Sequence, residues 1–275
     1  MNRLYLSVVF FLGSVFCFSS CEEVIDLDLQ STEVPLIVVQ GQIVDTAGYS
    51  WIQLTESLDF YTPTRAPRLS GAKVEVSDDL GNIQAFREDT AGFYVPVDPN
   101  FRGEVGRTYT LSVQAGERHL TATSELLPVT QIDSLVTRKV EGVPFKEDGY
   151  YLYFFAKEPP NEENFYRWKV YRNDTLFDEF DDILLADDEF VQENIENLEL
   201  PYAFEVGDTV ALEQYSLNEE VYNYYNELLT LAFNDGGLFS PPPVNPPSNI
   251  EGENVLGVFS ASSLIRMVEI IEEEE

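Results

Sequence analysis

The sequence predicts a mainly β protein of two domains, the second of which carries one helix. Apolar and polar residues alternate along many short stretches of the first half, for example around Val74, Val76 and Leu111. Alternation with a period of two is the pattern of strands that bury one face. Turn-forming stretches such as 79–82 (DLGN) separate these strands, and a helical period occurs over residues 217–234.

Residues 35–127 are predicted to form an N-terminal β-sandwich domain of the immunoglobulin-like or transthyretin-like type. Ile52 and Leu54 also alternate with polar neighbours, and glycine-containing turns follow at 103–106 and 115–116. Short strands at regular spacing, with no helical pattern between them, are typical of such sandwiches.

Residues 128–275 are predicted to form a second, β-rich domain. Residues 150–156 are continuously apolar, and Trp168 lies in an alternating stretch that ends at a turn, Asn173-Asp174. Residues 206–213 and 255–259 have the composition of two further strands, the second of which is expected to close the domain.

The predicted helix over residues 217–234 has its own start and stop signals. Ser216 and Glu219 have the spacing of a capping box, in which both side chains accept hydrogen bonds from free backbone N–H groups. Gly236-Gly237 can end the helix in a left-handed turn. The proline-rich residues 239–247 are predicted to form an extended connector, with a proline-rich recognition peptide as the alternative.

The first 20 residues have the features of a secretory signal peptide. A positive start precedes an apolar segment over residues 4–18, and small residues then lead to Cys21. The apolar segment is short for a membrane-spanning helix, which needs ~20 residues. Because the pattern resembles a bacterial lipobox, we predict lipidation of Cys21 and an acidic tether over residues 21–34. An ordinary secreted protein that is cleaved nearby is the alternative.

The charge of the chain excludes one class of partner. It has 49 Asp and Glu against 16 Lys and Arg, a formal net charge of −33 at pH 7. Nucleic acid is excluded because phosphate binding needs a basic surface. An anionic membrane surface would also repel the chain, so membrane attachment is expected to depend on the lipid. Cys17 and Cys21 are the only cysteines, so the exported domains are expected to fold without disulfides.

A non-catalytic protein without cofactor or metal is predicted from the absence of catalytic motifs in the sequence. The single histidine, His119, excludes two-histidine zinc motifs, and its alternation with Leu120 and Ala122 places it on the polar face of a strand. The sequence contains no nucleophile elbow or phosphate loop. A carboxylate pair for glycan hydrolysis stays open among so many acidic residues.

Two acidic clusters, residues 181–182 and 187–189, flank the apolar residues 183–186. Carboxylates are ligands that calcium prefers, but the spacing lacks the glycine and terminal glutamate of an EF-hand loop. Solvated acidic loops are the favoured interpretation.

Several short motifs resemble a known lipoprotein family. They are residues 21–27 (CEEVIDL), 36–41 (LIVVQG), 70–74 (SGAKV), 92–94 (GFY), 106–111 (GRTYTL), 248–250 (SNI) and 256–261 (LGVFSA). They are similar to domain-of-unknown-function family 4249 of Bacteroidota outer membranes. The resemblance implies an outer-membrane lipoprotein whose genomic setting is that of an accessory to TonB-dependent receptors, and no functional residue carries over from it.

The acidic residues that follow Cys21 resemble a Bacteroidota signal for export to the cell surface. Glu22 and Glu23 fit this pattern, which favours the cell surface, with the periplasmic face of the outer membrane as the alternative.

Asp-Thr or Asp-Ser followed by an apolar residue occurs repeatedly and resembles the acceptor of the Bacteroidota general O-glycosylation system. The Asp side chain of such pairs can also simply open a turn. The candidate acceptors are Thr46, Thr90, Ser134, Thr175 and Thr209.

Two classes of function are expected from these observations. The protein is predicted to be an accessory or ligand-binding partner of a TonB-dependent nutrient uptake receptor, or else a structural or adhesive scaffold; a glycan or peptide hydrolase is a third alternative. The candidate partner-binding loop is the region of Phe60, Tyr61, Arg65 and Arg68, which combines aromatic residues with scarce positive charge. An ordinary hairpin connection is the other interpretation of this loop.

Overall fold

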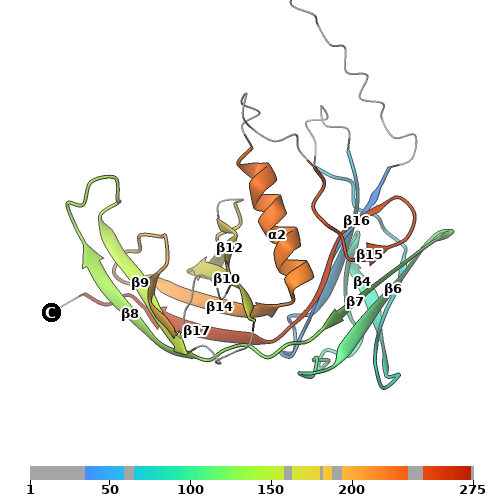
Figure 1. Cartoon of the computed structure of the whole chain (residues 1–275), viewed down its shortest axis with the longest axis horizontal. Helices are drawn as coiled ribbons and strands as arrows, with labels where there is room; N and C mark the ends of the chain where they lie inside the picture. Colours follow the sequence, from blue (N-terminus) through green and yellow to red (C-terminus); the bar gives the residue numbers. More distant parts are fainter. Residues whose placement is uncertain are drawn as a thin grey trace, which may run out of the picture. The chain divides into compact units, whose positions relative to one another are not determined.

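Strands make up most of the structure, and α2 is the single α-helix among the described residues (Figure 1). The computed structural model describes residues 35–58, 65–157, 163–179, 182–187, 194–234 and 244–273. The prediction of a mainly β fold with one helix is confirmed. Within these ranges, no helix has the length and apolar character needed to cross a membrane.

The elements follow one another in this order: β1 (Ile37–Val44), β2 (Trp51–Glu56), β3 (Lys73–Asp78), β4 (Ile83–Thr90), β5 (Phe93–Pro96), β6 (Thr108–Ala115), β7 (Arg118–Glu125), β8 (Ile132–Val140), β9 (Gly149–Lys157), β10 (Phe165–Arg172), β11 (Thr175–Leu176), β12 (Leu184–Asp187), β13 (Asn194–Glu199), β14 (Thr209–Leu217), α2 (Glu219–Ala232), β15 (Ile250–Glu251), β16 (Val255–Ser262) and β17 (Leu264–Ile270).

The first seven strands belong to one nine-stranded sheet in the order β15-β7-β6-β3-β4-β5-β2-β1-β16. The sheet curls until its two ends meet, because Leu127 forms a bridge with Ser262 of β16 and the Ala261 N–H donates to Ser124 Oγ of β7 at 2.8 Å. Alternate residues of each strand point inward, as the period of two predicts. The enclosed core includes Ile52, Leu54, Val74, Val76, Tyr109, Leu111 and Val113.

The last strand of this sheet, β16, comes from the far end of the chain and pairs in parallel with β1. At Gly257 the backbone has φ +123°, and a side-chain carbon there would lie 1.8 Å from the carbonyl oxygen of Val39 in β1. Glycine therefore permits a close approach of the two backbones. The Phe259 N–H donates to Asn249 Oδ1 at 2.9 Å, and Asn249 Nδ2 donates to the Phe259 carbonyl at 2.7 Å. A strand over residues 255–259 is confirmed and runs on to Ser262, but it does not close the second domain as expected, because it pairs with β1 of the nine-stranded sheet.

The remaining strands form two smaller sheets around a second core. One sheet has the order β11-β10-β14-β17, with β12 also paired to β10, and the other has the order β13-β9-β8. Residues 150–154 of β9 are all buried, as the continuous apolar stretch predicts. Tyr166, Trp168 and Val170 of β10 point into this core with 1–3% of their surface exposed. Because side chains alternate along a strand, Arg167 and Lys169 lie on the opposite face of β10.

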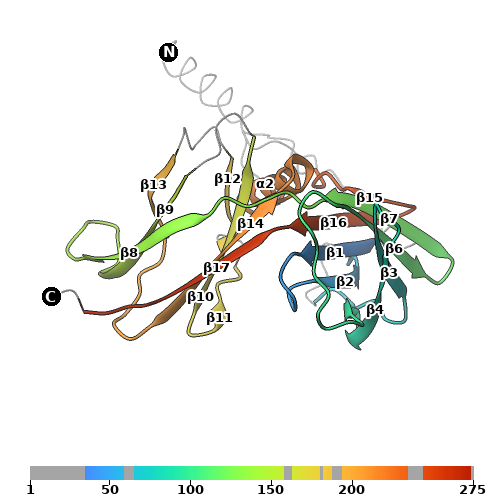
Figure 2. The same ribbon diagram turned by 90° about the horizontal axis from the view of Figure 1, so that it is seen from below.

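The polypeptide runs almost without interruption from β16 into β17, with only Ser263 between them (Figure 2). This segment therefore pairs with β1 in the nine-stranded sheet and then with β14 in the five-stranded sheet. Residues Val34–Glu275 cluster as one compact unit, and the domain boundary near residue 128 stays a prediction. Hydrogen bonds cross this boundary, because the Leu264 N–H donates to Asp45 Oδ1 at 3.0 Å.

The start of the helix differs from the prediction. Ser216 lies in β14, where its hydroxyl donates to the Leu127 carbonyl at 2.7 Å, so it does not cap the helix. Asn218 is the N-cap residue and makes no side-chain capping bond, since its amide contacts Ser124. The capping box of Ser216 and Glu219 is therefore wrong, because Ser216 belongs to β14 and Asn218 occupies the N-cap position. Gly236-Gly237 and most of the proline-rich stretch lie outside the described residues.

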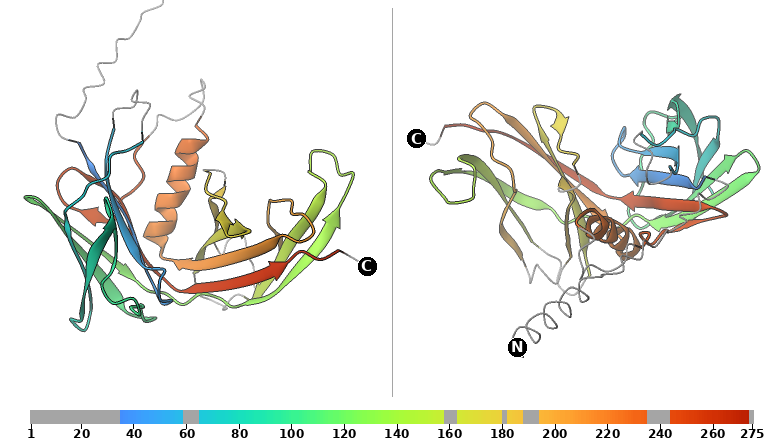
Figure 3. Two further views of the ribbon diagram at one scale, coloured as in Figure 1. Left: turned by 180° about the vertical axis from the view of Figure 1, so that it is seen from behind. Right: turned by 90° about the horizontal axis from the view of Figure 1, so that it is seen from above.

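One predicted strand is displaced. Residues 206–207 form a turn, and β14 begins at Thr209 and extends to Leu217 rather than ending at residue 213. Gly207, with φ +94°, suits this turn. The helix α2 contacts β10, β12 and β16, and it lies over one face of the five-stranded sheet (Figure 3). Val221 and Tyr224 are its buried residues.

Candidate functional site

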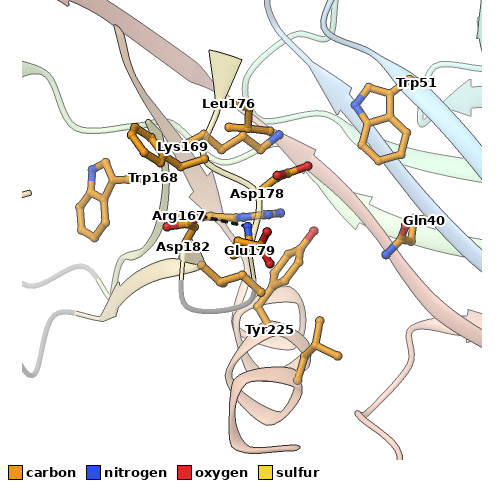
Figure 4. Close-up of a pocket in the computed structure, with 13 residues that line it drawn as sticks. Gln40, Trp51, Arg167, Trp168, Lys169, Leu176, Asp178, Glu179, Asp182 and Tyr225 are labelled. Carbon is orange, nitrogen blue, oxygen red and sulfur yellow. Dashed lines mark hydrogen bonds between the residues drawn. The ribbon is translucent and has the colours of Figure 1, made fainter. Parts of the chain in front are cut away.

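A cleft of about 310 Å³ lies among β10, α2, the β11–β12 connection and the first two strands (Figure 4). We call it the β10–α2 cleft. Arg167 and Lys169 of β10 supply its positive charge, and Tyr225 and Leu228 of α2 form part of its wall. Trp51 of β2 faces these residues from the opposite side.

Both cations of the cleft are positioned by aromatic rings. The Arg167 guanidinium lies 4.1 Å from the centroid of the Tyr225 ring, and the Lys169 ammonium lies 4.6 Å from that of Tyr215. A cation above an aromatic face is attracted by the ring quadrupole, which favours this arrangement without neutralising the charge. The two side chains are therefore held in place while they remain positively charged.

Neither cation has an ion-pair or side-chain hydrogen-bond partner within the described ranges. Arg167 Nε is buried and has no hydrogen-bond acceptor there. This is unusual for buried polar groups, nearly all of which are paired. Other cations do have acidic partners: Arg107 with Asp78, Lys146 with Glu199 and Arg172 with Asp208, at 2.9, 2.7 and 3.4 Å.

The environment of Lys169 makes its positive charge costly. Burial and the nearby charge of Arg167 lower the pKa of Lys169 to about 8, and the Glu213 carboxylate opposes this shift only partly. A bound anion would relieve the same penalty, because an opposite charge stabilises the ammonium form.

Glu213 lies beside the cleft at the centre of a buried network. Its side chain is almost fully buried, and its Oε2 accepts hydrogen bonds from the hydroxyls of Tyr171 at 2.9 Å and Tyr215 at 2.7 Å. Arg266 Nε lies 3.4 Å from its Oε1. Burial and the negative charge of Glu213 raise the pKa of both tyrosines, which keeps them protonated as donors. The network holds the Tyr215 ring under Lys169.

The rim of the cleft is acidic. Asp178, Glu179 and Asp182 line it from the β11–β12 connection, and the Glu179 N–H donates to Asp182 Oδ2 at 2.9 Å. No ion pair joins these carboxylates to Arg167 or Lys169. The cleft thus presents positive charge on its β10 wall and negative charge on its rim.

Part of the predicted partner-binding loop can be placed. Cys21, Phe60 and Tyr61 lie outside the described residues. Arg65 and Arg68 are exposed, and Arg68 forms an isolated backbone bridge with Thr55 of β2. Neither arginine lines the β10–α2 cleft. The loop stays a prediction.

The predicted glycan acceptors differ in exposure. Thr90, at the end of β4, and Thr175, the first residue of β11, are exposed, whereas Thr46, Ser134 and Thr209 are half-buried. Several of the preceding acids have structural partners. The Leu264 N–H donates to Asp45 Oδ1 at 3.0 Å, and Asn173 Nδ2 donates to Asp208 Oδ1 at 2.7 Å. Glycosylation at these positions stays a prediction.

His119 is exposed on β7, while Leu120 and Ala122 are buried on the other face, which confirms its placement on the polar face. Of the acidic clusters, Asp182 and Asp187 are described, and the other members lie outside the described ranges. Among the residues that the structure does describe, no three His, Cys, Asp or Glu side chains lie together in a group that could hold a metal ion.

The cleft residues were not predicted as a site from sequence. Arg167 and Lys169 could be recognised only as the polar partners of Tyr166 and Trp168 in an alternating strand. A usable signal was nevertheless present, since two cations share one face of a strand in a very acidic chain. Trp51 and Tyr225 are too distant in sequence to be associated with that pair in advance.

The chain was compared with known proteins. A family model described as "Domain of unknown function (DUF4249)" matches residues 22–264. A comparison with curated protein sequences finds no matching relative.

Proposed function

We propose a binding function for this protein, which belongs to the DUF4249 family. The protein is a non-catalytic outer-membrane lipoprotein of Bacteroidota type, anchored through Cys21. It acts as the accessory of a TonB-dependent nutrient uptake receptor and binds a ligand of that system in the β10–α2 cleft.

The observation that carries this proposal is a pair of cations in the cleft, Arg167 and Lys169, that have no ion pair among the described residues. Keeping Arg167 and Lys169 charged without an ion pair lowers the stability of the fold, because both side chains are half-buried and Arg167 Nε is fully buried. Such a cost is expected where a ligand supplies the missing partner. The aromatic groups around the pair, Tyr225 and Trp51, suit a binding surface.

The location rests on the sequence. The apolar residues 4–18 that precede Cys21 support export and lipidation, and several acyl chains would anchor the protein permanently. Glu22 and Glu23 favour the cell surface. An anchored protein with a small ligand site can raise the local concentration of the ligand at a receptor in the same membrane.

Crosslinking and affinity capture from intact cells test the proposal. The wild-type protein should recover one outer-membrane receptor, and Cys21→Ser should lose it because the protein leaves the membrane. Recovery of other copies of this chain alone would favour a scaffold. Turnover of a glycan or peptide by the purified protein would replace the binding function with a hydrolase.

A further inference from the structure

The lining of the β10–α2 cleft combines two cations, three carboxylates and several apolar side chains. Arg167 and Lys169 lie on β10, two residues apart and on the same face of the strand. The carboxylates of Asp178, Glu179 and Asp182 lie on the rim and make no ion pair with them. Leu176, Phe177, Ile183 and Leu228 line the space between these groups.

We propose that the β10–α2 cleft binds a zwitterion, a free amino acid or short peptide, with its carboxylate between Arg167 and Lys169 and its ammonium group at the acidic rim. This assignment of a ligand class rests on the binding function proposed above. The carboxylate would give buried Arg167 Nε an acceptor, and a charge-assisted hydrogen bond of this kind is among the stronger ones. An apolar side chain would lie against Leu228 and Trp51.

The charge distribution favours a zwitterion over other anions. A ligand with several negative charges, such as a polyphosphate, would meet three carboxylates on the rim and a protein of net charge −33. A simple carboxylate would bring no positive group to those rim carboxylates. A simple amine would be repelled by Arg167 and Lys169. The volume of about 310 Å³ lies at the small end of ligand sites, which suits one or two amino-acid residues.

Three probes that share one apolar group separate these possibilities. L-phenylalanine carries both charges, 3-phenylpropionate carries only the carboxylate, and phenethylamine carries only the ammonium group. Binding to the full-length protein in detergent micelles is measured by isothermal titration calorimetry and by tryptophan fluorescence, because both tryptophans, Trp51 and Trp168, line the cleft. We expect phenylalanine to bind at least tenfold more tightly than either of the other probes.

Variants assign the two ends of the ligand. Arg167→Met should weaken phenylalanine and phenylpropionate binding at least tenfold, whereas the double change Asp178→Asn with Asp182→Asn should weaken phenylalanine but not phenylpropionate. Arg138→Met is the matched control, because Arg138 also lies over a tyrosine ring, 4.3 Å from the centroid of Tyr153, but outside the cleft. It should leave all affinities unchanged.

Proton uptake on ligand binding can be measured with the wild-type protein. The groups that face Lys169 are Arg167 on its own strand, Glu213 and Tyr215 on β14, Tyr225 on α2 and the three rim carboxylates. A bound carboxylate favours the protonated form of Lys169, whose pKa lies near 8 without ligand. Phenylalanine binding at pH 8.5 should therefore take up protons, as measured in buffers of different ionisation enthalpy. Lys169→Met should reduce this uptake.

Binding of phenylpropionate as tight as that of phenylalanine would overturn the zwitterion assignment, as would binding that Arg167→Met leaves intact. No binding of any probe at millimolar concentration would also overturn it. None of these results affects the capture of a receptor from cells, so the failure of the ligand class and of the accessory function can be told apart.

Discussion

Replacing Gly257 by alanine is expected to destabilise the protein far more than a usual glycine-to-alanine change. Gly257 has φ +123°, a conformation that costs an alanine about 1–3 kcal/mol. The new Cβ would also lie 1.8 Å from the Val39 carbonyl oxygen and 2.8 Å from the Val39 nitrogen. Because these are backbone atoms, no side-chain rotation relieves the clash, and β1 must move away from β16. Overpacking of this kind costs about 1–3 kcal/mol more.

The expected loss is therefore about 4 kcal/mol. With a denaturant slope of ~3 kcal/mol per molar urea for a chain of this size, the unfolding midpoint should fall by roughly 1.3 M. Far-UV circular dichroism and tryptophan fluorescence can follow the transition. Both signals should report the same shift, because β16 and β17 link the two cores.

Gly81→Ala is the matched control. Gly81 also has a positive φ, +85°, but no atom lies within 4 Å of the position of a Cβ. Gly81→Ala should lower the free energy of unfolding only by the cost of the positive φ, about 1–2 kcal/mol. If Gly257→Ala costs no more than Gly81→Ala, the close contact of β1 and β16 does not exist as described and the reasoning fails.

Three further changes have defined outcomes. Cys21→Ser should release the protein from the membrane fraction and abolish palmitate labelling; retention of the variant in membranes would contradict the lipid anchor. Glu213→Ala should cost about 3 kcal/mol in urea unfolding, because it leaves the Tyr171 and Tyr215 hydroxyls without an acceptor, and Glu213→Gln should cost less. Lys169→Met should alter the pH dependence of the free energy of unfolding. Between pH 8 and 10.5 the unfolded chain holds a proton that folded Lys169 has lost, so the stability of the wild type should rise with pH relative to that of the variant. A stability difference that stays constant over this pH range would refute the lowered pKa of Lys169.

The strands were predictable from sequence because one buried face imposes a period of two. This holds for the alternation around Val74, Leu111 and Trp168, and for the continuous apolar stretch that became β9, which is buried along most of its length. The period of two indicates which residues of a strand are buried, but it does not indicate which strands pair with one another. That β16 pairs with β1 rather than with a strand near it in sequence could not be read from the pattern.

The helix start shows why local signals fail. Ser216 and Glu219 have the correct spacing for a capping box, but β14 continues through Ser216 to Leu217. The Ser216 hydroxyl then donates to Leu127, 89 residues away in sequence. This long-range hydrogen bond uses the donor that the capping box would need, and a sequence window of helical length does not contain both partners.

The structure explains the role of the two motifs near the C-terminus, which the sequence alone did not. Asn249 of the SNI motif is bonded to both backbone groups of Phe259, so its side chain pairs with β16 as a neighbouring strand would. Gly257 of the LGVFSA motif permits the close approach to Val39. Both motifs therefore maintain the position of β16, which explains why they contain no candidate catalytic residue.

The same strand connects the fold to the candidate site. Gln40 and Trp51, on the β1–β2 side of the cleft, are neighbours of β16 through β1, and Glu213 beneath Lys169 is paired in register with Arg266 of β17. The cations of β10 and the aromatic wall of β2 are thus held at a fixed separation by one continuous segment, 255–270. A cleft whose opposite walls are tied in this way is preorganised, so a ligand that bridges them loses little free energy to ordering the protein. Loosening β16 by Gly257→Ala should therefore weaken phenylalanine binding in protein that is still folded, whereas Gly81→Ala should not.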